Sequence, residues 1–146
     1  MQTKHRALLA ALPLAALGLM AFAVQQKDDE TEAIRHAVQF YIDGHATGQR
    51  QVMEQAFHPS ARLQSINNDE VAIRPIEQYL SGMPGQPASD ESERKRKIAL
   101  IDYRGTAAIA RVELDYPSVT FVDYMQLLKV GDEWKIVNKI YHMDRK

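Results

Sequence analysis

The stretch VTFVDYMQLLKVGDEWKIVNKIYH, residues 119–142, decides the fold of this 146-residue chain. Two runs rich in β-branched and aromatic residues flank a Gly131-Asp132 turn, a pattern typical of a long antiparallel hairpin. Both runs carry apolar residues on both faces, because side chains alternate along a strand. A sheet of this kind must be covered on both sides. We expect helices from the first half of the chain to cover one face, and a partner chain or an enclosed cavity to complete the other.

Strict alternation assigns the polar residues of this hairpin to its two faces. Asp123 falls on an apolar face of the first strand, and a carboxylate among apolar neighbours must be paired, protonated or exposed at a cavity. Asn138 and His142 fall together on the face of the second strand that carries Trp134 and Ile136. The same alternation allows Asn138 to line a pocket as a hydrogen-bond donor, with His142 nearer its rim. Because the strand lies close to the end of the chain, an exposed His142 is the favoured alternative.

Residues 1–23 have the pattern of an export signal. A short basic region precedes an Ala- and Leu-rich run over residues 7–20, and Ala21-Phe22-Ala23 is a small-x-small cleavage site. The alternative is an uncleaved membrane anchor, but the apolar run falls short of the ~20 residues that a spanning helix needs. We expect cleavage after Ala23 and a periplasmic or secreted protein. Residues 24–30 then form a flexible tether, and residues 31–146 form one domain.

Composition excludes several classes of function. The net charge is −1, and a nucleic-acid-binding protein would show a basic stripe. The run of four bases at residues 94–97 adjoins an acidic loop and is interpreted as a solvated strand entry rather than an anion site. The chain has no cysteine, and no HxH or HExxH spacing occurs. We therefore expect no disulfide, no metal and no cofactor.

The spacing of apolar residues and the positions of glycine and proline predict the remaining helices and strands. Helical spacing predicts a helix from Thr31, closed by glycines at 44 and 48, and a second helix ending at His58-Pro59. Short strands over residues 61–66 and 71–73 precede a third helix that starts at Pro75. A hairpin over residues 98–116 completes the pattern. The expected fold class is α+β: three N-terminal helices packed on a strongly bent, mostly antiparallel sheet, which together form a cone with an open mouth.

Three runs carry a resemblance to a known family: AVQFYIDGHATGQRQVMEQAFHPSARL (37–63), IDYRGTAAIARV (101–112) and FVDYMQLLKVGDEWKIVNK (121–139). They resemble the nuclear-transport-factor-2-like (NTF2-like) superfamily, and within it the putative lumazine-binding family, near the SnoaL-like cyclases and the ketosteroid isomerases. The resemblance implies a cone-shaped α+β fold, a pocket between helices and sheet, and homodimerisation through the outer face of the sheet.

The resemblance also bears on chemistry. In the register set by FHPSARL, Tyr41 falls where the ketosteroid isomerases have their oxyanion tyrosine, whereas their base aspartate falls on Ser65. A serine hydroxyl is too weakly basic for that role, which argues against ketosteroid isomerisation. Tyr41 is either a pocket hydroxyl or a core tyrosine bonded locally. Asp123 is either a base or ligand anchor, or one half of a structural pair with a lysine, an arginine or a tyrosine.

Three functions remain open. The first is an exported binding module for a small apolar or aromatic molecule, with candidate ligand-binding residues Tyr41, Tyr103, Asp123, Asn138 and His142. The second is a cofactor-independent enzyme of the SnoaL-like cyclase, dehydratase or isomerase type, in which Asp123 or His58 moves a proton. The third is a protein-interaction module. An acid and a base that converge on one enclosed point would favour the enzyme. An ion pair between Asp123 and a lysine or an arginine would favour binding or a structural role.

Overall fold

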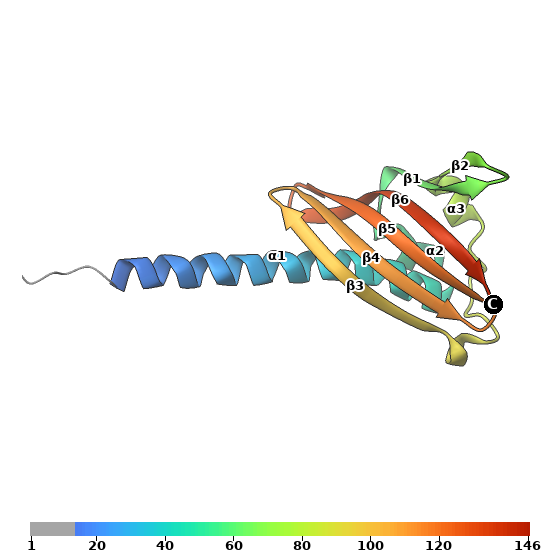
Figure 1. Ribbon diagram of the computed structural model, residues 1–146, viewed down its shortest axis with the longest axis horizontal. Coiled ribbons are helices and arrows are strands. Elements are labelled where there is room, and N and C mark those ends of the chain that lie inside the picture. Colours follow the sequence, from blue (N-terminus) through green and yellow to red (C-terminus); the bar gives the residue numbers. More distant parts are fainter. Residues whose placement is uncertain (1–13) are drawn as a thin grey trace, which may run out of the picture. The chain divides into compact units, whose positions relative to one another are not determined.

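The computed structural model describes residues 14–146, which comprise a segment ending at Glu30 and a compact unit of residues 31–146 (Figure 1). One long helix, α1, spans this division. The elements are α1 (Leu14–Thr47), α2 (Arg50–Glu54), β1 (Phe57–Asn67), β2 (Glu70–Pro75), α3 (Ile76–Ser81), the 3-10 turn η1 (Glu91–Glu93), β3 (Lys95–Arg104), β4 (Ala107–Tyr116), β5 (Val119–Val130) and β6 (Glu133–Arg145). Their order is the predicted one, and β1, β2, β3 and β6 are longer than predicted, whereas β5 has the predicted bounds.

Helix α1 begins at Leu14 rather than at Thr31, so the predicted tether, residues 24–30, has helical backbone. The physical reason is that no glycine or proline interrupts residues 19–43, and Gln, Lys and Glu propagate a helix well. Residues 1–13 of the predicted leader lie outside the described residues, and cleavage after Ala23 stays a prediction. Among residues 14–146, no helix has the length and apolar content needed to cross a membrane.

Six strands form one curved sheet in the order β2-β1-β6-β5-β4-β3. All neighbours are antiparallel except β1 and β6, which confirms the mostly antiparallel sheet. The register shifts at one point in each of the pairs β1·β6, β3·β4 and β5·β6. Such bulges bend a strand and increase its local twist, and one of them determines the site described below.

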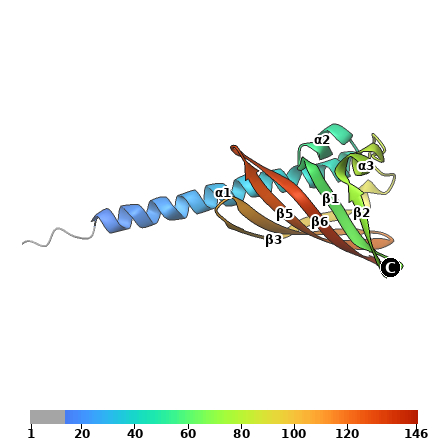
Figure 2. The ribbon, with the colours of Figure 1, turned by 90° about the horizontal axis from the view of Figure 1, so that it is seen from above.

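The core lies on one face of the sheet. Figure 2 shows the part of α1 from Thr31 onward running along that face, with α2 and α3 beside the β1–β2 end. Ile34, Val38 and Tyr41 recur at helical spacing on α1 and are fully buried, as their spacing predicts. They face inward-pointing side chains of the long strands, Val112, Leu114, Met125, Leu127 and Ile136.

The end of α1 depends on one glycine. Gly48 has φ +68°, a conformation that L side chains rarely adopt, and a Cβ there would lie 2.0 Å from the carbonyl oxygen of Gln86. Gly44, predicted to help close the helix, instead lies inside it. The second helix also ends earlier than predicted, at Glu54, and His58 lies on β1 rather than at a helix end. Pro59 explains this, since the residue before a proline favours extended geometry.

Candidate functional site

The centre of the site is Asp123, a carboxylate with no exposure to solvent. Alternation along β5 places it on the inner face with Met125 and Leu127, as the sequence predicts. A carboxylate in this position requires partners, because burial of an unpaired charge is very unfavourable. Both of its oxygens are occupied.

Two side chains from distant elements bind Asp123. The Tyr41 hydroxyl, on α1, donates to Oδ2 over 2.5 Å. Lys139 Nζ, on β6, donates to Oδ1 over 3.1 Å and to the Tyr41 hydroxyl oxygen over 2.9 Å. Tyr41, Asp123 and Lys139 thus form a closed triangle of hydrogen bonds, the Asp123 cluster. It links the helix to two strands across the core.

Lys139 reaches this cluster because β6 contains a bulge. Gln126 pairs with Asn138 but Leu127 pairs with Ile136, so Val137 is the extra residue. One extra residue moves every later side chain to the opposite face. Beyond the bulge, Lys139 and Tyr141 face the core.

The bulge also corrects the predicted pocket. Asn138 pairs with Gln126 and accepts a hydrogen bond from Gln64. His142 is exposed beside Asp144, where it lines the wider groove described below but not the cavity. Both lie on the outer face beyond the bulge, opposite the core. The prediction that they share the face of Trp134 and Ile136 is wrong, because strict alternation does not hold through the extra residue.

Burial controls the protonation of the cluster. It lowers the pKa of Lys139 below the ordinary lysine value, and the negative charge of Asp123 opposes that change. Burial, with the same negative charge, raises the pKa of Tyr41 well above that of an ordinary tyrosine. Tyr41 therefore stays protonated, and it both donates to the carboxylate and accepts from the amine.

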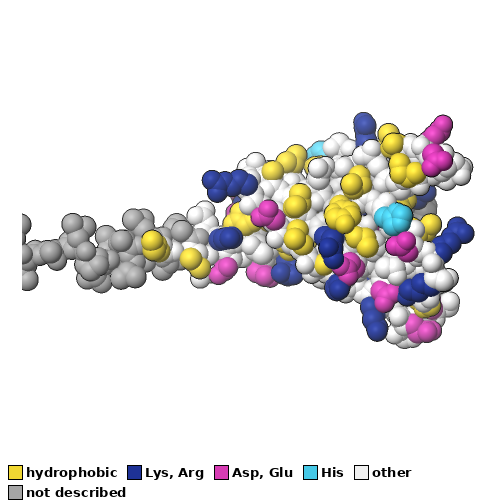
Figure 3. All heavy atoms as spheres, in the orientation of Figure 1, with side chains coloured by type: hydrophobic (Ala, Val, Ile, Leu, Met, Phe, Trp, Pro, Cys, Tyr) yellow, Lys and Arg dark blue, Asp and Glu magenta, His cyan; other side chains and the backbone are white. Residues whose placement is uncertain are grey.

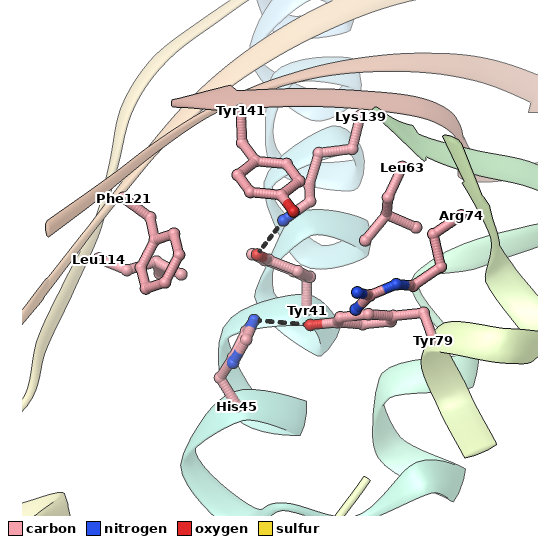
Figure 4. Close-up of a pocket in the computed structure, with 9 residues that line it drawn as sticks. All are labelled: Tyr41, His45, Leu63, Arg74, Tyr79, Leu114, Phe121, Lys139 and Tyr141. Carbon is pink, nitrogen blue, oxygen red and sulfur yellow. Dashed lines mark hydrogen bonds between the residues drawn. The ribbon is translucent and has the colours of Figure 1, made fainter. Parts of the chain in front are cut away.

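A cavity of about 200 Å³ lies against this cluster (Figure 4). Aromatic and aliphatic side chains form most of its wall. The lining residues are Tyr41, His45, Leu63, Arg74, Tyr79, Leu114, Phe121, Lys139 and Tyr141. Lys139 Nζ lies 4.6 Å from the ring centroid of Tyr141, 5.0 Å from that of Tyr41 and 5.9 Å from that of Tyr79. The amine is thus enclosed by three aromatic rings.

A second polar pair faces the same cavity. The Tyr79 hydroxyl and His45 Nε2 are 3.1 Å apart. Burial of the imidazole lowers the pKa of His45 to about 3, and the positive charge of Lys139 adds to this effect. Burial also raises the pKa of Tyr79. The pair is therefore a neutral imidazole bonded to a neutral phenol, and neither group adds charge to the cavity.

The cavity continues into a wider groove of about 600 Å³ between β1, β2 and the end of β6. The two spaces share Leu63, Arg74, Phe121 and Tyr141, so the groove adjoins the cavity that Lys139 lines. Within the described part of the chain, no aspartate or glutamate lines either space, whereas Lys139 and Arg74 do. The cavity wall is therefore mainly apolar and aromatic, whereas the groove also carries the polar side chains of Ser65, Asn67, Gln78 and His142. The Lys and Arg side chains that line the two spaces are both cations.

The other predicted site residues lie away from this cavity. Tyr103 packs edge to face against Trp134 with centroids 6.4 Å apart, and His58 Nδ1 is 2.7 Å from the Ser60 hydroxyl. Neither lines the cavity or the groove. Across residues 14–146, no group of three or more His, Asp or Glu side chains is placed to hold a metal ion.

Sequence reasoning missed five lining residues of the cavity that carry polar groups: His45, Arg74, Tyr79, Lys139 and Tyr141. A signal existed for His45, which is four residues after Tyr41 and so lies on the same face of α1. Lys139 and Tyr141 had no such signal, because a period of two assigns them to the outer face. Arg74 reaches the cavity because it pairs directly with Leu63, a buried residue of β1, and so lies on the same face of the sheet.

The sequence was compared with known families and proteins. The profile of the family described as "Putative lumazine-binding" matches residues 29–142. An NTF2-like protein of unknown function from Shewanella baltica is 31% identical, with a TM-score of 0.72, 81% of this chain covered and 96% of that one. An NTF2-like protein from Methylobacillus flagellatus is 30% identical, with a TM-score of 0.69 and coverages of 80% and 93%.

A curated relative bears an enzyme's name. The aldolase FrzH of a Cladobotryum species is 23% identical over 115 residues, which are 77% of this chain and 90% of that protein.

Proposed function

This chain belongs to the putative lumazine-binding family of the NTF2-like superfamily, and from that premise we propose that it binds a small, largely aromatic molecule bearing an acidic or carbonyl oxygen. One observation carries the proposal: an aromatic-walled cavity whose charged lining side chains, Arg74 and Lys139, are both cations. Aromatic rings favour a flat apolar body, and charged donors favour an oxygen acceptor.

In the proposed binding function, Lys139 and Arg74 contact the ligand and Asp123 holds Lys139 in position. The Asp123 cluster is satisfied before any ligand enters, because both carboxylate oxygens already accept hydrogen bonds. Lys139 has three N–H donors and uses two of them within the cluster. The third is available to an acceptor in the cavity, and Arg74 lies at the junction with the groove. Asp123 thus orients Lys139 and does not itself contact the ligand.

Native mass spectrometry and thermal shift test this proposal. A molecule retained from the producing cell under gentle conditions, and released on denaturation, would identify the ligand. In thermal shift, we expect lumazine or benzoate to raise the melting temperature and benzylamine, with a similar ring but the opposite charge, to have no effect. Arg74→Gln should weaken the benzoate response. An equal response to benzoate and benzylamine would contradict the proposal.

A second candidate is an enzyme, and the similarity to a protein named an aldolase favours it. Asp123 and Tyr41 converge beside the cavity, as proton transfer requires, whereas His58 lies outside it. We therefore keep Asp123 and set His58 aside as the candidate proton-transfer residue. Turnover of an aldol substrate that is lost in Tyr41→Phe, with ligand binding retained, would favour this candidate.

We also propose that a second copy of the chain covers the outer face of the sheet. Apolar side chains gather there over β3–β6 (Figure 3), and Leu100, Ile109, Tyr124, Leu128 and Ile140 are each 44–50% exposed. Light scattering after size exclusion tests this: Ile140→Glu should yield a monomer. Val71→Glu, an exposed apolar residue on β2, should leave the dimer intact. A monomeric wild type would refute the proposal.

Finally, we propose that the protein is exported and acts in the periplasm or outside the cell. The support is the basic, apolar and small-residue pattern of residues 1–23. Fractionation followed by N-terminal sequencing tests it. A mature protein that starts at Val24 is the expected result, and a full-length protein in the cytoplasm would contradict it.

A further inference from the structure

Lys139 has surroundings that a structural ion pair alone does not require. Its side chain is 6% exposed, yet it forms part of the cavity wall, so its amine is shielded from bulk water and accessible to a bound molecule. The groups that contact the amine are three aromatic rings, the Tyr41 hydroxyl and the Asp123 carboxylate. Arg74 also lines this cavity, and its positive charge helps to lower the pKa of Lys139. An amine with an adjacent proton acceptor and a desolvated site is the arrangement that makes a lysine nucleophilic.

We propose that Lys139 Nζ forms a reversible iminium with the carbonyl carbon of an aromatic aldehyde or 2-oxo acid bound in the cavity. This rests on the proposed function, because it requires a small molecule to occupy the cavity, and it names the chemical class of that molecule. Arg74, which also lines the cavity, supplies a positive charge for the carboxylate of a 2-oxo acid.

The protons and electrons of this step balance within the Asp123 cluster. The Lys139 ammonium first passes a proton to Asp123 Oδ1, 3.1 Å away. The free Nζ lone pair then forms the C–N bond while the carbonyl π electrons move to oxygen. A proton passes from nitrogen to that oxygen through the Tyr41 hydroxyl, which lies 2.9 Å from Nζ, and gives a neutral carbinolamine.

Loss of water completes the reaction. Asp123 returns its proton through the Tyr41 hydroxyl, which bonds its carboxylate and lines the cavity, to the carbinolamine hydroxyl. The C–O bond then breaks, and water leaves. The nitrogen lone pair forms the C=N bond of a protonated iminium. The cluster starts and ends with one positive nitrogen beside one carboxylate, so no net charge enters or leaves the buried site. Burial also lowers the pKa of Lys139, which makes the first proton transfer easier.

Reductive trapping tests the proposal. Wild-type protein is incubated at pH 7 with phenylglyoxylate and sodium cyanoborohydride, which donates hydride to an iminium and fixes the adduct. Intact mass and peptide mapping then locate it. We expect labelling of Lys139 to exceed that of the exposed Lys97 severalfold, because the cavity holds the ketone beside Nζ and a lowered pKa leaves more of the amine unprotonated. Mandelate, which has a hydroxyl in place of the ketone, should block the labelling.

The controls separate this inference from the binding function. Lys139→Arg keeps the positive charge beside Asp123 and should abolish the adduct, and mapping of the wild type decides the result even if that variant does not fold. If mandelate and phenylglyoxylate both raise the melting temperature but Lys139 is unlabelled, the iminium is refuted and binding stands. If neither probe shifts the melting temperature and no adduct forms, both proposals fail. Equal labelling of Lys97 and Lys139 also refutes the iminium.

Discussion

The two faces of the sheet each carry a three-membered polar cluster, and the clusters differ in their access to water. On the inner face, Asp123 and Lys139 have side chains 0% and 6% exposed. On the outer face, Glu113 bonds both Lys97, at 2.7 Å, and Arg111, and the three side chains, which we call the Glu113 cluster, are 22%, 67% and 43% exposed. Similar carboxylate–cation pairs are therefore buried in the protein core on one face and in contact with water on the other.

The difference shows that a close ion pair has no fixed energetic value. In water, Coulomb attraction is weak and the pair contributes little. In the core, the attraction is strong, but it mainly offsets the cost of removing both charges from water. The Asp123–Lys139 ion pair therefore adds little to the free energy of unfolding. Removal of one partner alone is nevertheless very destabilising, because the other charge is left buried and unpaired.

The largest effect is expected for Lys139→Met. Methionine has a similar volume, so the change leaves the Asp123 carboxylate buried without its cation, and the free energy of unfolding should fall by about 3–5 kcal/mol. Urea denaturation measures it. The double variant Asp123→Leu/Lys139→Met removes both charges and should recover much of the loss. A loss below about 1 kcal/mol in the single variant would show that the inner pair behaves like a surface pair.

Tyr41→Phe should have the next largest effect. The Tyr41 hydroxyl donates to Asp123 Oδ2 and accepts from Lys139, and its removal leaves a buried oxygen without a donor. Hydrogen bonds to charged groups contribute about 1.5–3 kcal/mol, and we expect a loss in that range by urea denaturation. The matched control is Tyr124→Phe on the outer face, where the ring is 50% exposed. Equal losses in the two variants would contradict the comparison.

Mild acid should also distinguish the two faces. His45 lies beside the inner cluster, and its pKa is about 3 in the folded state against 6.5 ordinarily. The contribution of neutral His45 to the free energy of unfolding is therefore fully present above pH 6.5. It declines as the pH falls toward 3, because His45 takes up a proton in the unfolded chain at a higher pH than in the folded one. At pH 5 the free energy of unfolding should be lower than at pH 7 by up to ~2 kcal/mol from this source.

The Glu113 cluster on the outer face should lose its contribution to stability at a lower pH than His45 does. Lys97 and Arg111 hold the pKa of Glu113 below its ordinary value of 4.5, so its contribution is lost only as the pH falls below 4.5. Urea denaturation at pH 7 and pH 5 isolates the inner effect. We expect His45→Gln to lessen this pH dependence and His36→Gln, at an exposed position of α1, to leave it unchanged. The same slope in wild type and His45→Gln would rule out His45 as its source.

The smallest effect is expected for Lys97→Met, the outer counterpart of the first variant. An exposed pair contributes about 0–1 kcal/mol, and Arg111 still bonds Glu113 after the change. Urea denaturation in low salt and in 1 M salt measures it, because screening should remove most of the remaining difference. A loss comparable to that of Lys139→Met would mean that the outer face is itself buried, for instance in a dimer.

The sequence by itself determined the order of the elements, the mostly antiparallel sheet and the family. These follow from local patterns: the Gly131-Asp132 turn, the helical spacing of Ile34, Val38 and Tyr41, and the alternation along β5 that turns Asp123 inward. Such patterns are readable because turn chemistry and side-chain period depend on a few neighbouring residues.

Only the tertiary structure decided which groups meet at the site. The bulge at Val137 depends on how β6 pairs with β5, and it brings Lys139 and Tyr141 inward while it moves Asn138 and His142 outward. Asp123 and Tyr41 were predicted from single strands and helices, and a lysine or a tyrosine was among the partners considered for Asp123, but Lys139 was not identified. An interior polar cluster is set by register between segments far apart in the chain, and a shift of one residue in that register exchanges the two faces of the strand.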